Sequence, residues 1–559
     1  MSDHRRHLGL VGLLFVSVGG ILGSGWLFGP LYAVQLAGPA ALIAWVIGGL
    51  AIMIIALTFA ELGAMLPMNG GITRYSLLSY GRTAGFIASL SSWLTFTVIV
   101  AAEVQAVMQY GSIYLPWLTK EQLGADGHTI SHPLTLYGFL CAALLWILFS
   151  LINWRGVKLF SRINSGLTWV KIGLVIVVTV SLIVTSFRWE MLDNVAEGGF
   201  APYGMEGIFR ALAYGGVIYA FTGFQHAAIA AGESKNPHRD VPIAVIASIL
   251  FCLLCYIGLQ IAFLGGLRAA NFPEPGNWRE LGFPDQVGPI AGLARSLGVL
   301  WMFYVVFVGA IASPLGAGLI NLGSSVRIAR GMSHDRYLPR RLSRIGRYHS
   351  PGLLIILSFP VGLFLFLPFP GWQELVAFLT GVVVIAYAMG PLSLLALREQ
   401  LPDLKRPFRL SGAGLICPLA FVLCGLLIYC TGWSVVWKLG LVFGVCGGLF
   451  IATHALRCSG TGRSTRPDKD GDVEKIKETI DLRSASWMFP FLAGLVLLTW
   501  LGGHDGVEKI RDWQGAVAVA VWSLICYYIA RPLAIHPEQT QAYFDQIEAA
   551  HQEDHQNIE

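Results

Sequence analysis

The sequence predicts an all-α polytopic membrane protein with about 14 membrane-spanning helices. Of its 559 residues, 55% are hydrophobic and only 13% are charged, whereas a soluble domain usually carries about 25% charged residues. Apolar stretches of roughly 20 residues recur along the whole chain, and each can cross a hydrocarbon core about 30 Å thick. Two of these stretches are interrupted by glycine where a membrane helix would otherwise continue.

The first ten apolar stretches divide into two sets of five. The first set covers residues 8–187, the second covers 207–397, and each opens with a glycine-broken stretch. Because five is an odd number, the second set must cross the membrane with inverted topology, as in many secondary transporters. The sequence therefore predicts a 5+5 inverted-repeat transporter fold in which helices 1 and 6 are broken. The expected spans are 8–36, 38–66, 85–117, 133–152, 164–187, 207–231, 241–266, 290–326, 351–369, 373–397, 413–432, 435–457, 485–502 and 513–530.

The remaining stretches extend this plan to the C-terminus. Residues 413–457 supply helices 11 and 12, which complete a twelve-helix transporter body over residues 1–457. The polar segment 458–484, rich in Gly, Ser, Thr and mixed charge, is typical of a flexible linker. Two extra C-terminal helices are expected within 485–531, followed by an acidic, Gln-rich tail at 532–559.

The distribution of positive charge predicts the orientation. With the N-terminus inside, most of the 38 Lys and Arg residues fall in cytoplasmic loops, including a basic segment at 327–350 that we expect to form a short amphipathic helix. This asymmetry follows the positive-inside rule. It places both termini in the cytoplasm and the protein in a plasma (bacterial inner) membrane. The net charge of +5 is explained by this topology and does not indicate nucleic-acid binding.

The first break is the segment Gly23-Ser24-Gly25, inside the stretch 8–36. Breaking a membrane helix frees N–H groups at the start of the second half-helix, and these suit a carboxylate. The C=O groups freed at the end of the first half-helix suit an ammonium, so the two ends together can hold a zwitterion. Unwound backbone persists at membrane depth only where it is buried in protein or lines a cavity. The alternative is that the glycines simply permit close helix packing.

Four segments resemble motifs of the amino acid–polyamine–organocation (APC) transporters, in the order expected for that family. They are GILGSGWLFGP at 20–30, ELGAMLPMNGGITRY at 61–75, GESKNPHRDVP at 232–242 and RIARGMSHDRYLP at 327–339. The resemblance covers roughly residues 8–457. It implies the 5+5 fold and amino-acid transport, usually coupled to protons or to exchange. The last two spans exceed the common twelve-helix pattern of the family.

The second break, at residues 221–225, resembles the unwinding of helix 6 on the substrate side of the same family. The resemblance makes Gly223 and Gln225 candidate substrate-binding residues. Phe221 or Phe224 would cover the site as an apolar lid, or else belong to the ordinary core. His226 titrates near neutral pH, and we expect a packed, hydrogen-bonded histidine rather than a coupling residue.

Two charged residues lie deep in apolar stretches, where a charge is costly unless it faces a cavity or a partner. Lys171 resembles a lysine that replaces a sodium ion in proton-coupled members of the family. By that resemblance it would bridge the broken backbone near residues 19–20 and the helix that carries Ser313. The alternative is that Lys171 snorkels to the interface. Glu103 would carry the proton or contact a substrate amine, or would instead pair with a hydroxyl or backbone group.

These observations predict a secondary active amino-acid transporter that works by proton symport and alternating access. The pattern around Glu103 and Gln225 resembles the aspartate–proton symporters of the family. The alternative is an amino acid or polyamine exchanger of the same fold, which counterflow without a pH gradient would distinguish. The expected partners are an amino acid, protons and the lipid bilayer, without cofactor or metal. The sequence carries none of the common motifs of hydrolases or nucleotide-binding enzymes, so we predict no enzyme. It specifies neither the amino acid nor the oligomeric state.

Overall fold

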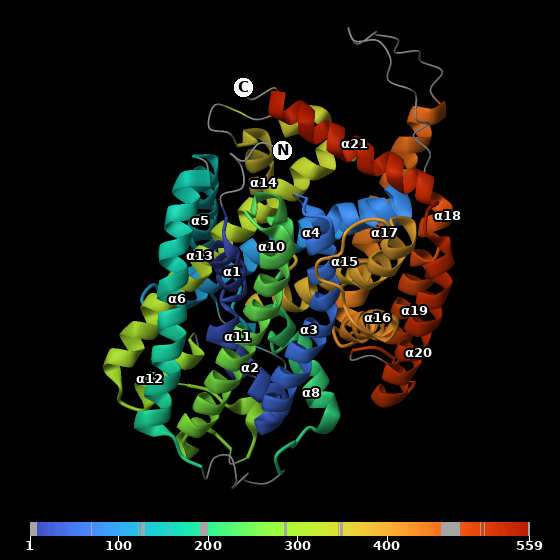
Figure 1. Cartoon of the computed structure of the whole chain (residues 1–559). Helices are drawn as coiled ribbons and strands as arrows, with labels where there is room; N and C mark the ends of the chain where they lie inside the picture. The colour runs from blue at the N-terminus through green and yellow to red at the C-terminus, as the bar shows by residue number, and fades with distance from the viewer. Residues whose placement is uncertain are drawn as a thin grey trace.

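The expected apolar stretches fold as α-helices that pack side by side in one bundle (Figure 1). The computed structural model describes residues 8–556 apart from positions 69, 121, 124–128, 156, 190–198, 275, 284–287, 345, 347–349, 370, 460–480, 503–504 and 508. Within these residues, 10 helices are long and apolar enough to cross a membrane, and three further apolar helices are shorter. The strands of this part of the chain, β1 (Gln122–Leu123) and β2 (Thr129–Ser131), form one short antiparallel pair. The all-α fold class is confirmed.

The described residues form consecutive helices over both ranges that we expect to be repeats. The first comprises α1 (Leu10–Ile21), α2 (Gly25–Ala37), α3 (Ala41–Met65), α4 (Gly71–Gly111), α5 (Leu136–Trp154) and α6 (Val157–Ser186). The second comprises α8 (Gly204–Ala213), α9 (Val217–Ala220), α10 (Gln225–Ile229), α11 (Pro237–Gly266), α12 (Pro289–Ser296), α13 (Leu300–His334), α14 (Gly352–Leu365) and α15 (Trp372–Gln400). The C-terminal part comprises α16 (Ala413–Tyr429), α17 (Trp433–Ser459), α18 (Leu482–Ala485), α19 (Met488–Gly502), α20 (Asp512–Ala530) and α21 (Pro537–Gln556).

The centre of the bundle is formed by α3, α4, α11, α13 and α15. α4 packs against α13 and α15, and α3 packs against α11. The most apolar window of α15 is 100% buried, whereas the corresponding window of α5 is only 22% buried. α15 is therefore an internal helix, and α5 presents most of its apolar surface to the surroundings, as a lipid-facing helix does.

Two segments differ from the sequence prediction. α4 begins at Gly71, well before the expected span 85–117, and kinks at Gly81, whose φ of 75° is a left-handed conformation that glycine adopts without a Cβ clash. The basic segment 327–350 does not form a separate amphipathic helix, because α13 continues to His334 and is followed by the 3₁₀ turn Arg340–Ser343. That prediction was wrong.

The C-terminal elements pack against the body of the bundle. α19 and α20 contact one another, α20 packs on α16, and α19 packs on α17. α21 lies across the end of the bundle at which α1 begins (Figure 1). Most of the expected linker, residues 460–480, lies outside the described residues.

Candidate functional site

The two breaks meet in the interior of the bundle. α1 ends at Ile21 and α2 begins at Gly25, whereas α9 ends at Ala220 and α10 begins at Gln225. A Cβ added at Gly25 would lie 2.9 Å from Ala220 Cβ, and one added at Gly223 would lie 2.6 Å from the backbone nitrogen of Ile21. Both distances are shorter than real Cβ contacts, so the chain at the two breaks packs too closely for a Cβ at either glycine.

The carboxylate of Glu103, from α4, lies at the start of α2. Its two oxygens accept hydrogen bonds from the backbone N–H of Ser24, at 3.1 and 2.9 Å, and Glu103 Oε1 accepts another from the Tyr219 hydroxyl at 2.5 Å. A Cβ added at Gly23 would overlap Glu103 Oε1. Because the first N–H groups of a helix lack backbone partners and carry partial positive charge, this is the place where the sequence predicts a ligand carboxylate. The protein fills it with a carboxylate of its own.

Hydrogen bonds connect polar side chains around Ser24 to the Glu103 carboxylate. Trp372 Nε1 donates to the Ser24 hydroxyl at 2.8 Å, and the hydroxyls of Ser24 and Tyr219 are 3.0 Å apart. Since Tyr219 donates to Glu103, the Ser24 hydroxyl must donate to Tyr219. A chain of hydrogen bonds thus runs from Trp372 through Ser24 and Tyr219 to Glu103. Glu103 therefore accepts hydrogen bonds from the Ser24 N–H and from the Tyr219 hydroxyl.

Lys171, from α6, holds the other side of the first break. Its Nζ donates to the backbone oxygen of Gly19 at 2.7 Å, and its side chain is fully buried. On α13 it packs against Gly316, where an added Cβ would lie 2.8 Å from Nζ. Ser313 lies about one turn earlier on α13, and its hydroxyl accepts a hydrogen bond from Trp26 Nε1 at 3.0 Å. Lys171 is thus bonded to α1 and packs on α13 at Gly316, about one turn from Ser313.

Side chains of the second break pack among aromatic residues. Gln225 Oε1 accepts hydrogen bonds from the N–H of Gly223 at 3.0 Å and from the Tyr387 hydroxyl at 2.9 Å. The ring of Phe224 lies 5.1 Å from that of Tyr387. Gln225 thus stabilises its own unwound segment in this structure.

Phe221 and His226 contact different helices. The Phe221 ring packs edge-on against Tyr256, at 5.4 Å between centroids. His226 pairs its Nδ1 with the Ser324 hydroxyl at 3.0 Å, and its ring lies against Gly20. The packed, hydrogen-bonded histidine expected from the sequence is present.

Sequence reasoning missed the aromatic residues that join the two breaks. The hydroxyl of Tyr256 reaches the backbone oxygens of both Ile21 and Ala220, at 3.1 and 2.9 Å. Tyr219, Trp372 and Tyr387 were missed in the same way. Their only signal was a polar atom on an aromatic ring inside an apolar stretch, and that signal is shared by many side chains that simply pack in a core.

The site is closed on the side of α2. Phe28 lies 4.8 Å from Trp372 and 5.2 Å from Tyr110, measured between ring centroids. Trp372 in turn contacts Ser24, which is fully buried. On the side of α10, the cavity next to Gln225 has a volume of about 10 Å³, which is room for about one water molecule. Entry of a larger ligand at the breaks requires these helices or side chains to move.

A family model described as amino acid permease matches residues 8–450 of the chain. The chain belongs to the amino acid permease family. The aspartate-proton symporter of Bacillus subtilis (strain 168) is 32% identical over 534 residues, which cover 95% of this chain and 97% of that protein. The glutamate/serine transporter AimA of the same organism is 32% identical over 535 residues, covering 94% of each chain. The branched-chain amino acid permease BcaP, also from that organism, is 26% identical over 438 residues, 77% of this chain and 89% of the other.

The family assignment explains the broken helices as part of a transporter and not of an enzyme. It also separates two regions of this permease. The family model ends at residue 450, within α17, whereas the alignments with the aspartate-proton symporter and AimA cover 95% and 94% of the chain. The C-terminal helix pair α19–α20 thus lies beyond the family model, and relatives of nearly full length exist.

Proposed function

We propose that this permease carries amino acids together with protons by alternating access. The observation that carries the proposal is the placement of Glu103: its carboxylate holds the N–H of Ser24, where a substrate carboxylate would bind. In this structure Glu103 occupies the Ser24 N–H at the helix start, and its carboxylate lies directly against Gly23. A substrate carboxylate and the Glu103 carboxylate therefore compete for this N–H.

Protonation resolves this competition. Two carboxylates that share one site repel one another, and one of them must take up a proton. Once Glu103 is protonated it is a weaker acceptor for the Ser24 N–H, so its side chain can leave and the substrate carboxylate can take its place. The proton and the substrate are then loaded together, which is the requirement for symport.

The amino group of the substrate has acceptors in the same place. The carbonyl oxygens of Ile21 and Ala220 lie at the ends of α1 and α9, and both accept from the Tyr256 hydroxyl. An ammonium would bind these oxygens more strongly than a neutral hydroxyl does. We therefore place the amino group between Ile21 and Ala220 and the carboxylate at Ser24.

Lys171 supplies the second titratable group. Its ammonium ties the end of α1 to α6 and packs on α13, and a buried ammonium is costly unless it keeps such partners. Loss of the Lys171 proton weakens the bond to Gly19 and releases α1. In our proposal Lys171 couples the charge at the breaks to the movement of α1.

The relatives support the substrate class. The two at 32% identity are named for aspartate and for glutamate and serine, so we propose an acidic or small polar amino acid. We further propose that the protein lies in the plasma membrane with both termini in the cytoplasm, since the charge distribution follows the positive-inside rule.

Transport in proteoliposomes tests the proposal. Uptake of radiolabelled aspartate, glutamate and serine is measured with the lumen alkaline relative to the outside, and then without a pH gradient. We expect accumulation only with the gradient. The alternative is an exchanger: uptake that needs preloaded substrate inside and does not respond to a pH gradient would favour it and contradict symport.

A further inference from the structure

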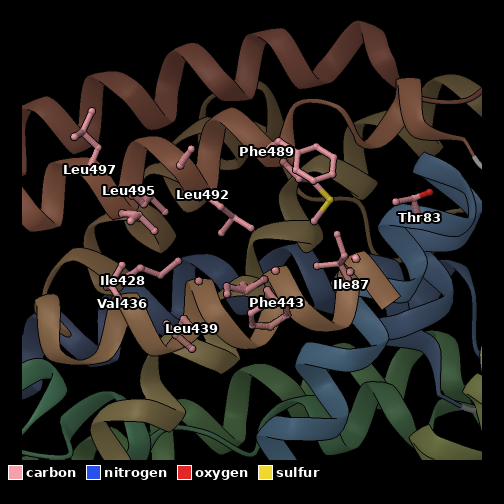
Figure 2. A pocket seen from close by; sticks show the side chains of 18 of the residues that line it. Thr83, Ile87, Ile428, Val436, Leu439, Phe443, Phe489, Leu492, Leu495 and Leu497 are labelled. Atoms are coloured by element: carbon pink, nitrogen blue, oxygen red, sulfur yellow. The ribbon is translucent and has the colours of Figure 1, made fainter. Parts of the chain in front are cut away.

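A large cavity of this permease lies between α17 and α19, and none of the residues that line it belongs to the two breaks. It has a volume of about 610 Å³ and is lined by α17, α19 and parts of α4, α15 and α16. Figure 2 shows Phe489 and Leu492 of α19 on one wall, Leu439 and Phe443 of α17 on the other, and Ile87 of α4 at one end. The lining is almost entirely aliphatic, aromatic or glycine.

Three glycines of α17 face this cavity without a neighbour. A Cβ added at Gly444, Gly447 or Gly448 would find no atom within 4 Å. Glycines in membrane helices usually permit close packing, and one on the adjacent helix does so: a Cβ at Gly494 of α19 would overlap the Trp522 ring of α20. The glycines of α17 therefore leave a gap that no described residue of the protein fills.

The gap is built into the packing. α19 is held on its other side, because α20 packs on α16 and Tyr429 of α16 donates a hydrogen bond to the backbone oxygen of Gly502 at 2.5 Å. α17 meanwhile packs on α15 and α19. An empty apolar gap of this size forfeits dispersion contacts along both walls, and its apolar lining offers water no hydrogen bonds.

We propose that this cavity, the α17–α19 slot, holds one acyl chain of a membrane phospholipid. Both helices are membrane spans by length and composition, so hydrocarbon is the medium around them. The slot is lined by α19 from Met488 to Trp500, a helix length of about 18 Å, against about 15 Å for one leaflet of the hydrocarbon core. Its rim is open: Phe489 is 54% exposed and Leu497 is 52% exposed. A chain can enter sideways from the bilayer.

Native mass spectrometry of the full-length protein tests the proposal. Protein is washed exhaustively in detergent, incubated with a phosphatidylethanolamine that carries palmitoyl and oleoyl chains, and the bound lipids are counted. We expect one retained lipid in the wild type and its loss in Gly444→Leu/Gly448→Leu, which fills the slot. The matched control is Gly414→Leu on α16, where an added Cβ also finds no atom within 4 Å outside the slot. It should keep the lipid.

The single variants Gly444→Leu and Gly448→Leu are made in parallel, so that one folded slot variant is available if the double variant fails to fold. Thermal unfolding and substrate uptake report folding for each. An equal lipid count in folded slot variants and wild type would overturn the proposal. So would a change of oligomeric state without a change in lipid count, because it would show that a second copy of the chain covers the slot.

Discussion

Replacing Glu103 by glutamine should make substrate binding independent of pH. In the mechanism that we propose, the substrate carboxylate displaces the Glu103 carboxylate from the Ser24 N–H only after Glu103 takes up a proton. Above the titration of Glu103, each pH unit lowers the protonated fraction tenfold, which corresponds to 1.36 kcal/mol per unit. Affinity in the wild type should therefore weaken about tenfold per unit as pH rises and level off at low pH. The neutral amide of the glutamine has no such titration.

The structure also gives the size of the effect. Glu103 accepts hydrogen bonds from Ser24 N and from the Tyr219 hydroxyl. A hydrogen bond to a charged group contributes about 1.5–3 kcal/mol, against about 0.5–1.5 kcal/mol for a neutral one. Across the two bonds, displacing the glutamine should cost about 2 kcal/mol less than displacing the carboxylate. This corresponds to roughly 30-fold tighter binding of substrate at alkaline pH.

The assay is a binding isotherm of the purified protein at a series of pH values, with uptake measured in parallel. Glu103→Gln should bind with a flat pH profile, exchange substrate in counterflow, and fail to accumulate it with a proton gradient. The matched control is Glu399→Gln, which removes an exposed carboxylate paired with Arg531 and should keep the wild-type profile. A pH profile in Glu103→Gln as steep as in the wild type would refute the competition.

Three further substitutions test other parts of the site. Lys171→Ala removes the ammonium from the Gly19 oxygen and should abolish proton-driven uptake in a folded protein; unchanged pH dependence of uptake would contradict its coupling role. Gly25→Val brings a branched side chain into Ala220 and should remove the thermal shift that substrate produces, whereas a retained shift would contradict the placement of the carboxylate. Tyr256→Phe removes the hydroxyl donor from the buried carbonyl of Ala220, whereas the Ile21 carbonyl keeps the Gly23 N–H. It should lower the free energy of unfolding by about 1–3 kcal/mol, with an unchanged midpoint of thermal unfolding as the contrary result.

The fold was predictable because a helix that crosses a membrane needs a long apolar stretch, which is easily recognised in a sequence. Long apolar stretches and glycine breaks indicate the number and order of the helices, and the structure has helices at those places. The first part of α4 was not predicted, because residues 71–80 include polar and charged side chains and lack the run of apolar residues that indicates a membrane span. The continuation of α13 to His334 was not predicted for a similar reason. A basic segment after an apolar stretch can either extend the preceding helix or form a separate one, and the sequence pattern does not distinguish the two.

The site was predictable only in part. Glu103 and Lys171 were recognisable because a charged side chain at membrane depth is costly unless it faces a cavity or a partner. Their partners do not stand out, because Ser24 and Glu103 are separated by 79 residues and the register between α2 and α4 is set by packing. The same holds for the packing of Lys171 on Gly316: the family resemblance indicates the helix that carries Ser313, but not which turn of that helix faces α6.

The most direct test of the central claim is to count protons on substrate binding. Isothermal titration calorimetry in buffers of different ionisation enthalpy measures the protons taken up as substrate binds at a pH where Glu103 is ionised. The competition between the substrate and Glu103 for the Ser24 N–H predicts uptake of about one proton per substrate in the wild type, since one carboxylate must be neutralised, and none in Glu103→Gln. Substrate binding without proton uptake in the wild type would contradict it.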